Sequence, residues 1–384
     1  MTEDHDNASV HHPEARRDDS ARPRAVAPVT RVEFLNDSDS TARTRWLALW
    51  RAWPGREVQA HPDYGRLFAH PTDQVVCAAL CTRAGGVLLP LILCPLGREA
   101  WAGAEFRGRC DAISPYGYGG PYAWNVDEQD SRSFWPQVHE WLAARGAVSL
   151  FLRLSLFPGQ TLAFDGDERA FGQHVVRTLG LPEEELWRDY AHKVRKNVAK
   201  ARRSGLTVIV DPQGERLEEF LSIYYATMDR RSAQPWYYFS RESFETMRRA
   251  LDGQYAFFHV VHEGRVVSTE LVLVSAEHIY SFLGGSLPEA FDHRPNDLLK
   301  HAVIEWGSRA GKKAFVMGGG YSPDDGVFRY KLSFAPRGGV PFRGGTRVYD
   351  GEAYWRLVEQ RRMWEKERGR EWHPRPVFFP EYRA

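Results

Sequence analysis

The sequence lacks any long apolar run. No stretch approaches the roughly 20 apolar residues that cross a membrane as a helix, and the mean hydropathy of the 384-residue chain is -0.49. Residues 1–29 are polar, mixed in charge and interrupted by proline, without the apolar core of a secretory signal. We therefore expect a disordered tail at 1–29 and a cytoplasmic protein with no membrane span.

Cysteine is scarce as well. All four cysteines lie in the first half of the chain, without histidine neighbours and without the spacing of a metal site: Cys77, Cys81, Cys94 and Cys110. Cys77 and Cys81 fall in an apolar run, which predicts buried free thiols in a reducing cytoplasm.

The short motifs of several enzyme classes are also missing. The sequence contains no Walker lysine loop, no G-x-G-x-x-G after a first strand, no nucleophile elbow and no His-x-x-x-His pair. The 14 histidines are scattered. Covalent serine chemistry and metal-dependent hydrolysis are therefore disfavoured, and we expect neither a metal nor another cofactor. The net charge is only +1, so global electrostatics indicates no partner.

The chain is long enough for two domains, because single cores stop growing at roughly 250–300 residues. The expected elements repeat in order: each half runs helix, antiparallel hairpin, further strand, helix and strand. This order predicts an α/β (α+β) fold of two similar units, each a mixed, largely antiparallel sheet flanked by helices. We place the units at 30–180 and 181–384, with the join near 175–190.

Local periodicity and turn residues predict the individual elements. In the first half we expect helices at 38–53 and 134–145, a hairpin of strands 75–81 and 87–94, and a strand at 147–157. In the second half we expect helices at 183–203, 217–229, 244–251 and 296–309, and strands at 206–210, 255–261, 266–274, 279–283 and 314–317.

A glycine-ended strand leads through an acidic loop into a segment of aromatic residues and lysine near the C-terminus. Gly318, Gly319 and Gly320 have no Cβ, so another molecule can approach their backbone closely. Lys331 follows beside Tyr330 in an expected aromatic strand, as a single cation among apolar residues. Such a cation can stabilise charge that develops during a reaction, or it can simply extend to solvent. The segment favours acyl transfer, with Lys331 catalytic or in contact with ligand.

Two carboxylates are candidates for accepting a proton. Glu270 is the only charge in its apolar strand, where burial would raise its pKa as a general base requires. A structural ion pair with an arginine would explain Glu270 equally well. Asp324, in the acidic loop before Lys331, can accept a proton or orient an amine, although loop acids are usually only solvated.

Five further side chains are candidates for substrate binding, together with the three glycines. Arg153 shares a strand face with Ser155, away from a row of leucines, and can clamp a phosphate or carboxylate of an acceptor. A salt bridge between domains is the alternative for Arg153. Tyr116 and Tyr118 belong to a loop rich in glycine, tyrosine and proline, and Arg241 adds a cation in the second half.

The segment 190–203 is a dense cationic helix in a nearly neutral protein. Apolar residues form a narrow stripe, and cations cover most of the remaining circumference. The pattern is typical of a contact with RNA or a polyphosphate, and a solvated helix face is the plainer alternative. The candidate RNA- or phosphate-binding residues are Lys193, Arg195, Lys196, Lys200 and Arg203.

As a set, these segments resemble the Fem-type peptidyltransferases, relatives of the acetyltransferase (GNAT) superfamily that are built from two tandem units. The resemblance covers most of the chain after the tail and is strongest in its second half. It rests on segments that are fairly specific for the superfamily but fix no substrate: 192–197 (HKVRKN), 225–228 (YATM), 264–269 (GRVVST), 283–286 (LGGS), 304–306 (IEW), 318–320 (GGG) and 330–334 (YKLSF).

The resemblance implies transfer of an amino acid from aminoacyl-tRNA to an amine of a small molecule, a peptide or a cell-wall precursor. By this resemblance, Lys331 stabilises the reacting acyl group and Tyr330 is the aromatic beside it. The first unit would hold the acceptor, and the second the acylated end of the tRNA. Ser155 stands where relatives that use muropeptides carry an acid, which argues for a different small amine or peptide.

Two other functions stay open. An acyl-CoA-dependent N-acyltransferase normally uses an Arg/Gln-x-x-Gly-x-Gly/Ala turn that opens a helix and holds pyrophosphate, whereas 202–205 (RRSG) closes the expected cationic helix. A non-catalytic module that binds RNA or a protein partner would need only that helix. The sequence fixes neither the amino acid carried, nor the acceptor, nor the oligomeric state.

Overall fold

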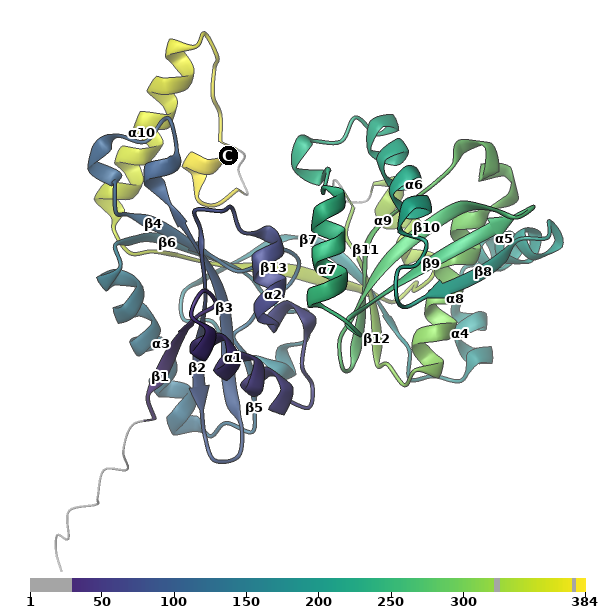
Figure 1. Cartoon of the computed structure of the whole chain (residues 1–384), viewed down its shortest axis with the longest axis horizontal. Helices are drawn as coiled ribbons and strands as arrows, with labels where there is room; N and C mark the ends of the chain where they lie inside the picture. The colour runs from purple at the N-terminus through teal and green to yellow at the C-terminus, as the bar shows by residue number, and fades with distance from the viewer. Residues whose placement is uncertain (1–29, 321–324, 375–377) are drawn as a thin grey trace, which may run out of the picture.

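One mixed sheet runs through both halves of the molecule. The computed structural model describes residues 30–320, 325–374 and 378–384, and within them it contains a 13-stranded sheet. The strand order is β1-β2-β3-β4-β6-β13-β7-β12-β11-β10-β9-β8, with β5 paired to β3. Helices flank this sheet, which confirms the expected α/β class. Figure 1 shows the first half on the left and the second half on the right.

The elements have the following bounds. The strands are β1 (Val32–Asn36), β2 (Gln74–Cys81), β3 (Gly86–Pro95), β4 (Cys110–Ile113), β5 (Tyr122–Trp124), β6 (Ala147–Arg153), β7 (Asp167–Thr178), β8 (Thr207–Asp211), β9 (Tyr255–His262), β10 (Arg265–Val274), β11 (His278–Ser286), β12 (Ala314–Gly318) and β13 (Gly339–Val348). The helices are α1 (Ser40–Ala52), α2 (Pro62–Phe68), α3 (Glu128–Ala144), α4 (Glu183–Asp189), α5 (His192–Arg203), α6 (Leu217–Arg230), α7 (Arg241–Ala250), α8 (Pro295–Arg309), α9 (Gly326–Leu332) and α10 (Gly351–Glu367).

The first half confirms the expected helix–hairpin order. The hairpin is β2–β3, and α1 and α3 supply apolar side chains to two separate cores that share the β2 and β3 strands. α3 begins at Glu128, earlier than expected, because the Asp127 carboxylate caps it by accepting the N–H of Asp130 at 2.8 Å. All four cysteines are free thiols, as expected, and three of them are buried.

The second half confirms the expected hairpin and corrects one helix. β9 and β10 are joined by Glu263 and Gly264, whose φ angles of 50° and 81° suit a tight two-residue hairpin turn. The helix expected at 183–203 is two helices, α4 and α5. It breaks because Tyr190 and Ala191 are extended, with ψ of 146° and 143°, and the Ala191 N–H donates to the Ser333 carbonyl at 2.9 Å.

Two strands that the sequence pattern did not predict join the halves. β7 pairs with β12 and β13, and β13 also pairs with β6 of the first half. In Figure 1 these strands lie between the two halves. The chain therefore completes β12 and α9 in the second half and then returns through β13 to the first.

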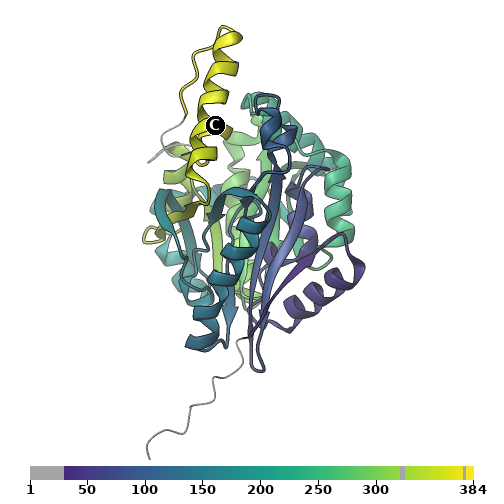
Figure 2. The same ribbon diagram turned by 90° about the vertical axis from the view of Figure 1, so that its left-hand side faces the viewer.

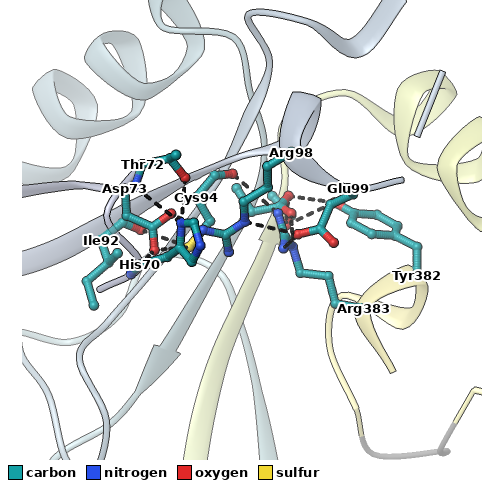
Figure 3. Close-up of polar contacts among 11 residues, drawn as sticks. His70, Thr72, Asp73, Ile92, Cys94, Arg98, Glu99, Tyr382 and Arg383 are labelled. Atoms are coloured by element: carbon teal, nitrogen blue, oxygen red, sulfur yellow. Dashed lines mark hydrogen bonds and ion pairs between the residues drawn. The ribbon is translucent and has the colours of Figure 1, made fainter. Parts of the chain in front are cut away.

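The C-terminal segment packs on the first half, where Figure 2 shows α10 in yellow. Apolar residues of α10, together with Tyr382, share a core with Leu96, Trp101 and Val148. Tyr382 and Arg383 enter the polar network of Figure 3, and both contact the buried carboxylate of Asp111, at 2.5 and 2.6 Å. The unit boundaries at 30–180 and 181–384 stay a prediction, while residues from β13 onward contact the first half.

The halves also share an apolar core and a buried polar contact. Side chains of the first half, among them Tyr64 and Tyr118, pack with Tyr280 and Leu271 of the second. The buried Glu57 carboxylate contacts His278 Nδ1 at 2.5 Å and accepts the Tyr280 hydroxyl at 2.7 Å. This junction holds the loop 114–122 of the first half against β11 and β12.

Candidate active site

Lys331 lies on the short helix α9, so the expectation of an aromatic strand is wrong. The helix forms because the Asp325 carboxylate caps it by accepting the Phe328 N–H at 2.7 Å. Phe328 packs into the core of the second half. With α9 packed in this way, Lys331 lies near the end of β12, where its Nζ donates to the Gly319 carbonyl at 2.6 Å.

The surroundings of Lys331 lower the pKa of its ammonium group. Burial first, and then the ammonium of Lys300, lower the pKa of Lys331 to about 8, while Glu270 and Asp325 oppose this shift. Lys331 is therefore mainly protonated at neutral pH and has an ammonium close to its titration point.

Glu270 is engaged by a lysine, not by the arginine considered as its alternative partner. Its side chain on β10 is only 3% exposed, and Oε1 accepts the Ser281 hydroxyl at 2.5 Å and pairs with the Lys300 ammonium. Oε2 has no hydrogen-bond partner within the described ranges. Catalysis by Glu270 stays a prediction. Asp324, the other candidate proton acceptor, lies outside the described residues.

Glycine is needed at the end of β12 for two reasons: Gly318 has a φ of +78°, and side chains of this chain crowd Gly319 and Gly320. A Cβ on Gly318 would lie 3.5 Å from Lys331 Nζ and 3.8 Å from Tyr118 Oη. A Cβ on Gly319 would clash with the His174 ring at 2.7 Å. A Cβ on Gly320 would clash even more closely with the carboxylate of Asp325. The close approach of another molecule to these glycines stays a prediction, because the groups that crowd Gly319 and Gly320 here are the protein's own side chains.

Tyr118 and His174 complete the group around Lys331. Tyr118 is buried, and its hydroxyl lies 2.7 Å from His174 Nδ1. His174 comes from β7 and stacks on Phe342 of β13, with ring centroids 4.3 Å apart. Burial first, and then Lys331, lower the pKa of His174 to about 4. No sequence pattern singles out His174, because it is one of many scattered histidines and lies in a strand of mixed polarity.

Arg153 ends β6 on the first-half side of the junction. Its guanidinium donates to the Ser114 carbonyl at 3.1 Å and lies 5.1 Å from the Phe151 ring and 5.9 Å from the Tyr116 ring. No carboxylate of the described chain forms an ion pair with it, so the salt-bridge alternative is not what the structure shows. Burial lowers the pKa of Arg153. A partly buried cation without a counter-charge in the described chain suits an anionic ligand.

The other first-half candidates differ in their surroundings. Tyr116 is 37% exposed and forms ring contacts with Phe68, Phe282 and Trp236, which come from both halves. Ser155 lies beyond the end of β6, and its hydroxyl accepts the Phe157 N–H at 3.1 Å. Tyr116 therefore contributes to an aromatic surface at the junction, whereas Ser155 caps a turn.

Tyr330 and Arg241, two further candidate residues, have surroundings that differ from those of Tyr118 and His174. Tyr330 packs against the second-half core and stacks edge-on to Phe334, and its hydroxyl is buried without a hydrogen-bond partner in the described chain. Arg241 is exposed at the start of α7 and pairs with Glu218 and, at 2.9 Å, with Glu245. These carboxylates already occupy the guanidinium of Arg241.

The helix α5 has the expected apolar stripe and cationic face. Val194, Val198 and Ala201 are buried. Four cations are exposed and have no ion pair with any described residue: Lys193, Lys196, Lys200 and Arg203. Arg195 differs, because its guanidinium donates to the carbonyls of Arg188 and Tyr190 at 2.8 and 2.5 Å and so caps α4.

Two surface pockets lie away from Lys331. One, of about 370 Å³, is lined by residues of α4, α5 and α8 around Trp187. The other, of about 460 Å³, is lined by both halves around Trp53 and Trp124. The described residues contain no group of three or more side chains that could hold a metal ion. In the same part of the chain, every helix is too short or too polar to cross a membrane.

Comparison with known proteins places this geometry in a known architecture. Residues 188–332 match the model of the acetyltransferase (GNAT) domain. The chain is similar to the solved structure of FemX, with 14% identity and a TM-score of 0.59, over 83% of this chain and 98% of FemX. No curated protein sequence matches the chain.

Two lysylphosphatidylglycerol synthetase structures are also similar. The first is the C-terminal domain of a protein from Agrobacterium fabrum that is described as a lysylphosphatidylglycerol synthetase. It has 12% identity and a TM-score of 0.51, over 82% of this chain and 96% of that one. The second is L-PGS from Bacillus licheniformis, with 12% identity and a TM-score of 0.50, over 84% and 96%.

The chain therefore has the Fem-type fold of tandem GNAT-like units, which confirms the architecture implied by the resemblance. The matched domain also defines the class of protein. Since it is the domain of acetyltransferases, the chain is an acyltransferase, as expected.

Proposed function

We propose that this acyltransferase moves an amino acid from the ester of aminoacyl-tRNA to the amine of a second substrate. The observation that carries this proposal is the Lys331 ammonium, held 2.6 Å from the Gly319 carbonyl at the junction of the two halves. The fold supports it, because the similar structures include FemX and synthetases named for joining lysine to phosphatidylglycerol.

The proposed chemistry needs little from the protein beyond charge and position. The amine attacks an ester that is already activated, and a tetrahedral oxyanion forms. Lys331 donates to that oxyanion, a contribution of roughly 3–4 kcal/mol to the transition state. Holding the two substrates together supplies much of the remaining acceleration.

The donor is assigned to the second half. Four exposed cations of α5 have no ion pair with a described residue, so they can contact the phosphates of tRNA without first breaking ion pairs. Arg202, which is also exposed, pairs with Glu305 at 3.5 Å. Lys193, Lys196, Lys200 and Arg203 are the proposed contacts. Arg195 is proposed to act only through the backbone carbonyls that it holds.

The acceptor is assigned to the first half. Arg153 is a cation without a carboxylate partner in the described chain, beside the half-exposed ring of Tyr116. This pair suits an amine acceptor that carries a phosphate or carboxylate next to an apolar or planar group. Tyr118 and the three glycines line the space between Arg153 and Lys331 in this proposal, and Ser155 shapes the adjoining turn.

An acyl-CoA donor is the second candidate, because the matched domain is named for acetyl transfer. The segment 202–205 does not supply the pyrophosphate-binding turn, since α5 ends at Arg203 and Gly205 follows with a φ of +78°. Helix ends of this kind expose carbonyls, which repel phosphate.

The test is transfer from a panel of purified aminoacyl-tRNAs to a panel of amines, followed by the intact mass of the acceptors. We expect transfer with wild type and a 10²–10³-fold lower kcat for Lys331→Met, the loss typical of one oxyanion donor. Lys313→Met is the matched control, because Lys313 is exposed and pairs only with Glu277. Transfer from acetyl-CoA without tRNA would replace the proposal with the second candidate. Activity with neither donor would favour a binding module.

A further inference from the structure

His174 is a buried titratable group beside Lys331 that the chemistry above does not use. It reaches the site from β7, the central strand between the halves. Its ring is fixed on three sides: Tyr118 contacts Nδ1 at 2.7 Å, Phe342 stacks on one face, and the Tyr118 ring meets it edge-on. The imidazole therefore has a set orientation.

The second nitrogen of this ring is available and lies against the same backbone as Lys331. Nε2 has no hydrogen-bond partner in the part of the chain that the structure describes. It lies 2.9 Å from the point that a Cβ on Gly319 would occupy, and the Gly319 carbonyl accepts the Lys331 ammonium. An imidazole nitrogen and an ammonium thus both approach the backbone of Gly319 at the end of β12.

We propose that His174 is the catalytic base of the transfer, with Tyr118 holding the proton on Nδ1 so that Nε2 is the accepting nitrogen. This inference rests on the proposed function and adds the group that takes the proton. It also explains why two half-molecules meet here, because Tyr118 comes from the first half and Lys331 from the second.

The step is balanced without any further reactant. The lone pair of the neutral amine forms a C–N bond to the ester carbon, and the carbonyl electrons move to the oxygen that Lys331 holds. The amine N–H proton passes to His174 Nε2. The ester C–O bond then breaks, the proton passes from Nε2 to the departing ribose oxygen, and the products are an amide and a free tRNA hydroxyl.

The electrostatics of the site suit this order of events. Because the pKa of His174 is about 4, the neutral, proton-accepting form dominates at neutral pH. The charged and titratable groups that face it are Lys331 from α9 and Tyr118 from the loop, and Phe342 of β13 carries no charge. An oxyanion formed on Lys331 offsets the charge of Lys331, which is the smaller of the two causes that lower this pKa after burial, so the basicity of His174 rises when a proton must be taken.

The activity test compares two histidines with the same local contact. His174→Gln is expected to lower kcat by 10²–10⁴-fold, the usual contribution of a positioned base, with a smaller change in KM. Added imidazole is expected to restore part of the activity of His174→Ala, which a purely structural role would not allow. His139→Gln is the control, because His139 Nδ1 also lies 2.7 Å from a tyrosine hydroxyl, that of Tyr349, away from Lys331. If wild type transfers and His174→Gln stays within threefold of it, the inference is overturned.

A second measurement needs no donor or acceptor and separates this inference from the proposed function. Nitrogen NMR of the histidine-labelled protein at neutral pH reports which ring nitrogen of His174 carries the proton. We expect the proton on Nδ1, and a higher pKa of His174 in Lys331→Met. A proton on Nε2 would overturn the assignment, whether or not any aminoacyl-tRNA proves to be a donor.

Discussion

Lys331 and His174 share one environment, but they have different protonation states at neutral pH. Both are partly buried, and burial is the largest cause of the lowered pKa in each. Because both are bases that are charged when protonated, burial favours their neutral forms, but their ordinary values differ by about four units. At neutral pH the lysine therefore keeps its charge while the histidine loses it, as the proposed roles of oxyanion donor and proton acceptor require.

This separation predicts a bell-shaped pH profile for kcat/KM. Protonation of His174 removes activity below a pH of about 4, and loss of the Lys331 proton removes it above about 8. In Lys331→Arg, whose guanidinium stays charged, the residual activity should persist above pH 8. The ratio of the wild-type rate to the Lys331→Arg rate cancels the ionisation of the acceptor amine. A ratio that stays constant from pH 7 to 10 would contradict the role of the Lys331 charge.

Part of the site could be predicted at this scale. Lys331, Tyr118 and Arg153 stand out in the sequence because each is a polar group in an apolar or glycine-rich setting. His174 and Lys300 do not stand out, since their roles come from register and helix packing: His174 faces Gly319 only because β7 lies beside β12. Substrate binding by Arg241 stays a prediction, and its guanidinium pairs with Glu218 and Glu245, as exposed cations commonly do with nearby carboxylates.

At the scale of elements, α5 combines a buried stripe with an exposed face on which four cations have no ion pair with a described residue. The stripe fixes which side packs on α8, so the cations have to face outward. If that face binds tRNA, its contribution is electrostatic and depends on salt.

Replacing Lys196, Lys200 and Arg203 by Gln is therefore expected to weaken tRNA binding and to reduce the slope of log K against log salt by about 1 for each lost phosphate contact. The control carries Gln at Arg356, Arg362 and Lys366 of α10, which removes the same charge from the first half. Filter binding or anisotropy at several salt concentrations measures both. Equal slopes for the two triple variants would exclude α5 as the contact.

The sequence predicts elements best where the signal is local. The β9–β10 hairpin follows from its two-residue turn, and most helices from their periodicity. β7 and β13 are missed because their sequences are polar and their partners are distant: Arg177 pairs with Phe315, and Gly344 with Arg153. The segment around Lys331 looks like a strand by composition, but the Asp325 cap makes it helical.

At the scale of the whole molecule, the order of the chain interlocks the halves. β6 and β12, from different halves, are joined through β13 and β7. The proposed active site therefore lies where strands from both halves are held by backbone hydrogen bonds, and the two halves cannot separate without breaking the central sheet. This suits a site whose groups come from both sides, because positioning errors of even 1 Å can be costly to catalysis.

The C-terminal turn packs on the first half through a buried polar contact, and the stability that this contact contributes should be measurable. Asp111 is fully buried on β4, and its carboxylate accepts from Tyr382 Oη at 2.5 Å, Arg383 Nε at 2.6 Å and Ser149 Oγ at 2.7 Å. Figure 3 shows Arg383 beside Glu99, which it contacts at 2.7 Å. Removing the guanidinium leaves a buried carboxylate without its counter-charge.

Arg383→Met is therefore expected to lower the free energy of unfolding by about 3–5 kcal/mol, the cost typical of breaking a buried ion pair from one side. Arg132→Met is the control, because its pair with Glu128 is exposed on α3 and should contribute less than about 1 kcal/mol. Urea unfolding followed by the many tryptophans compares the two variants. Asp111→Asn combined with Arg383→Met should recover part of the loss, because the pair is then removed from both sides. Equal stability of Arg383→Met and Arg132→Met would show that the C-terminal turn does not fasten the first half.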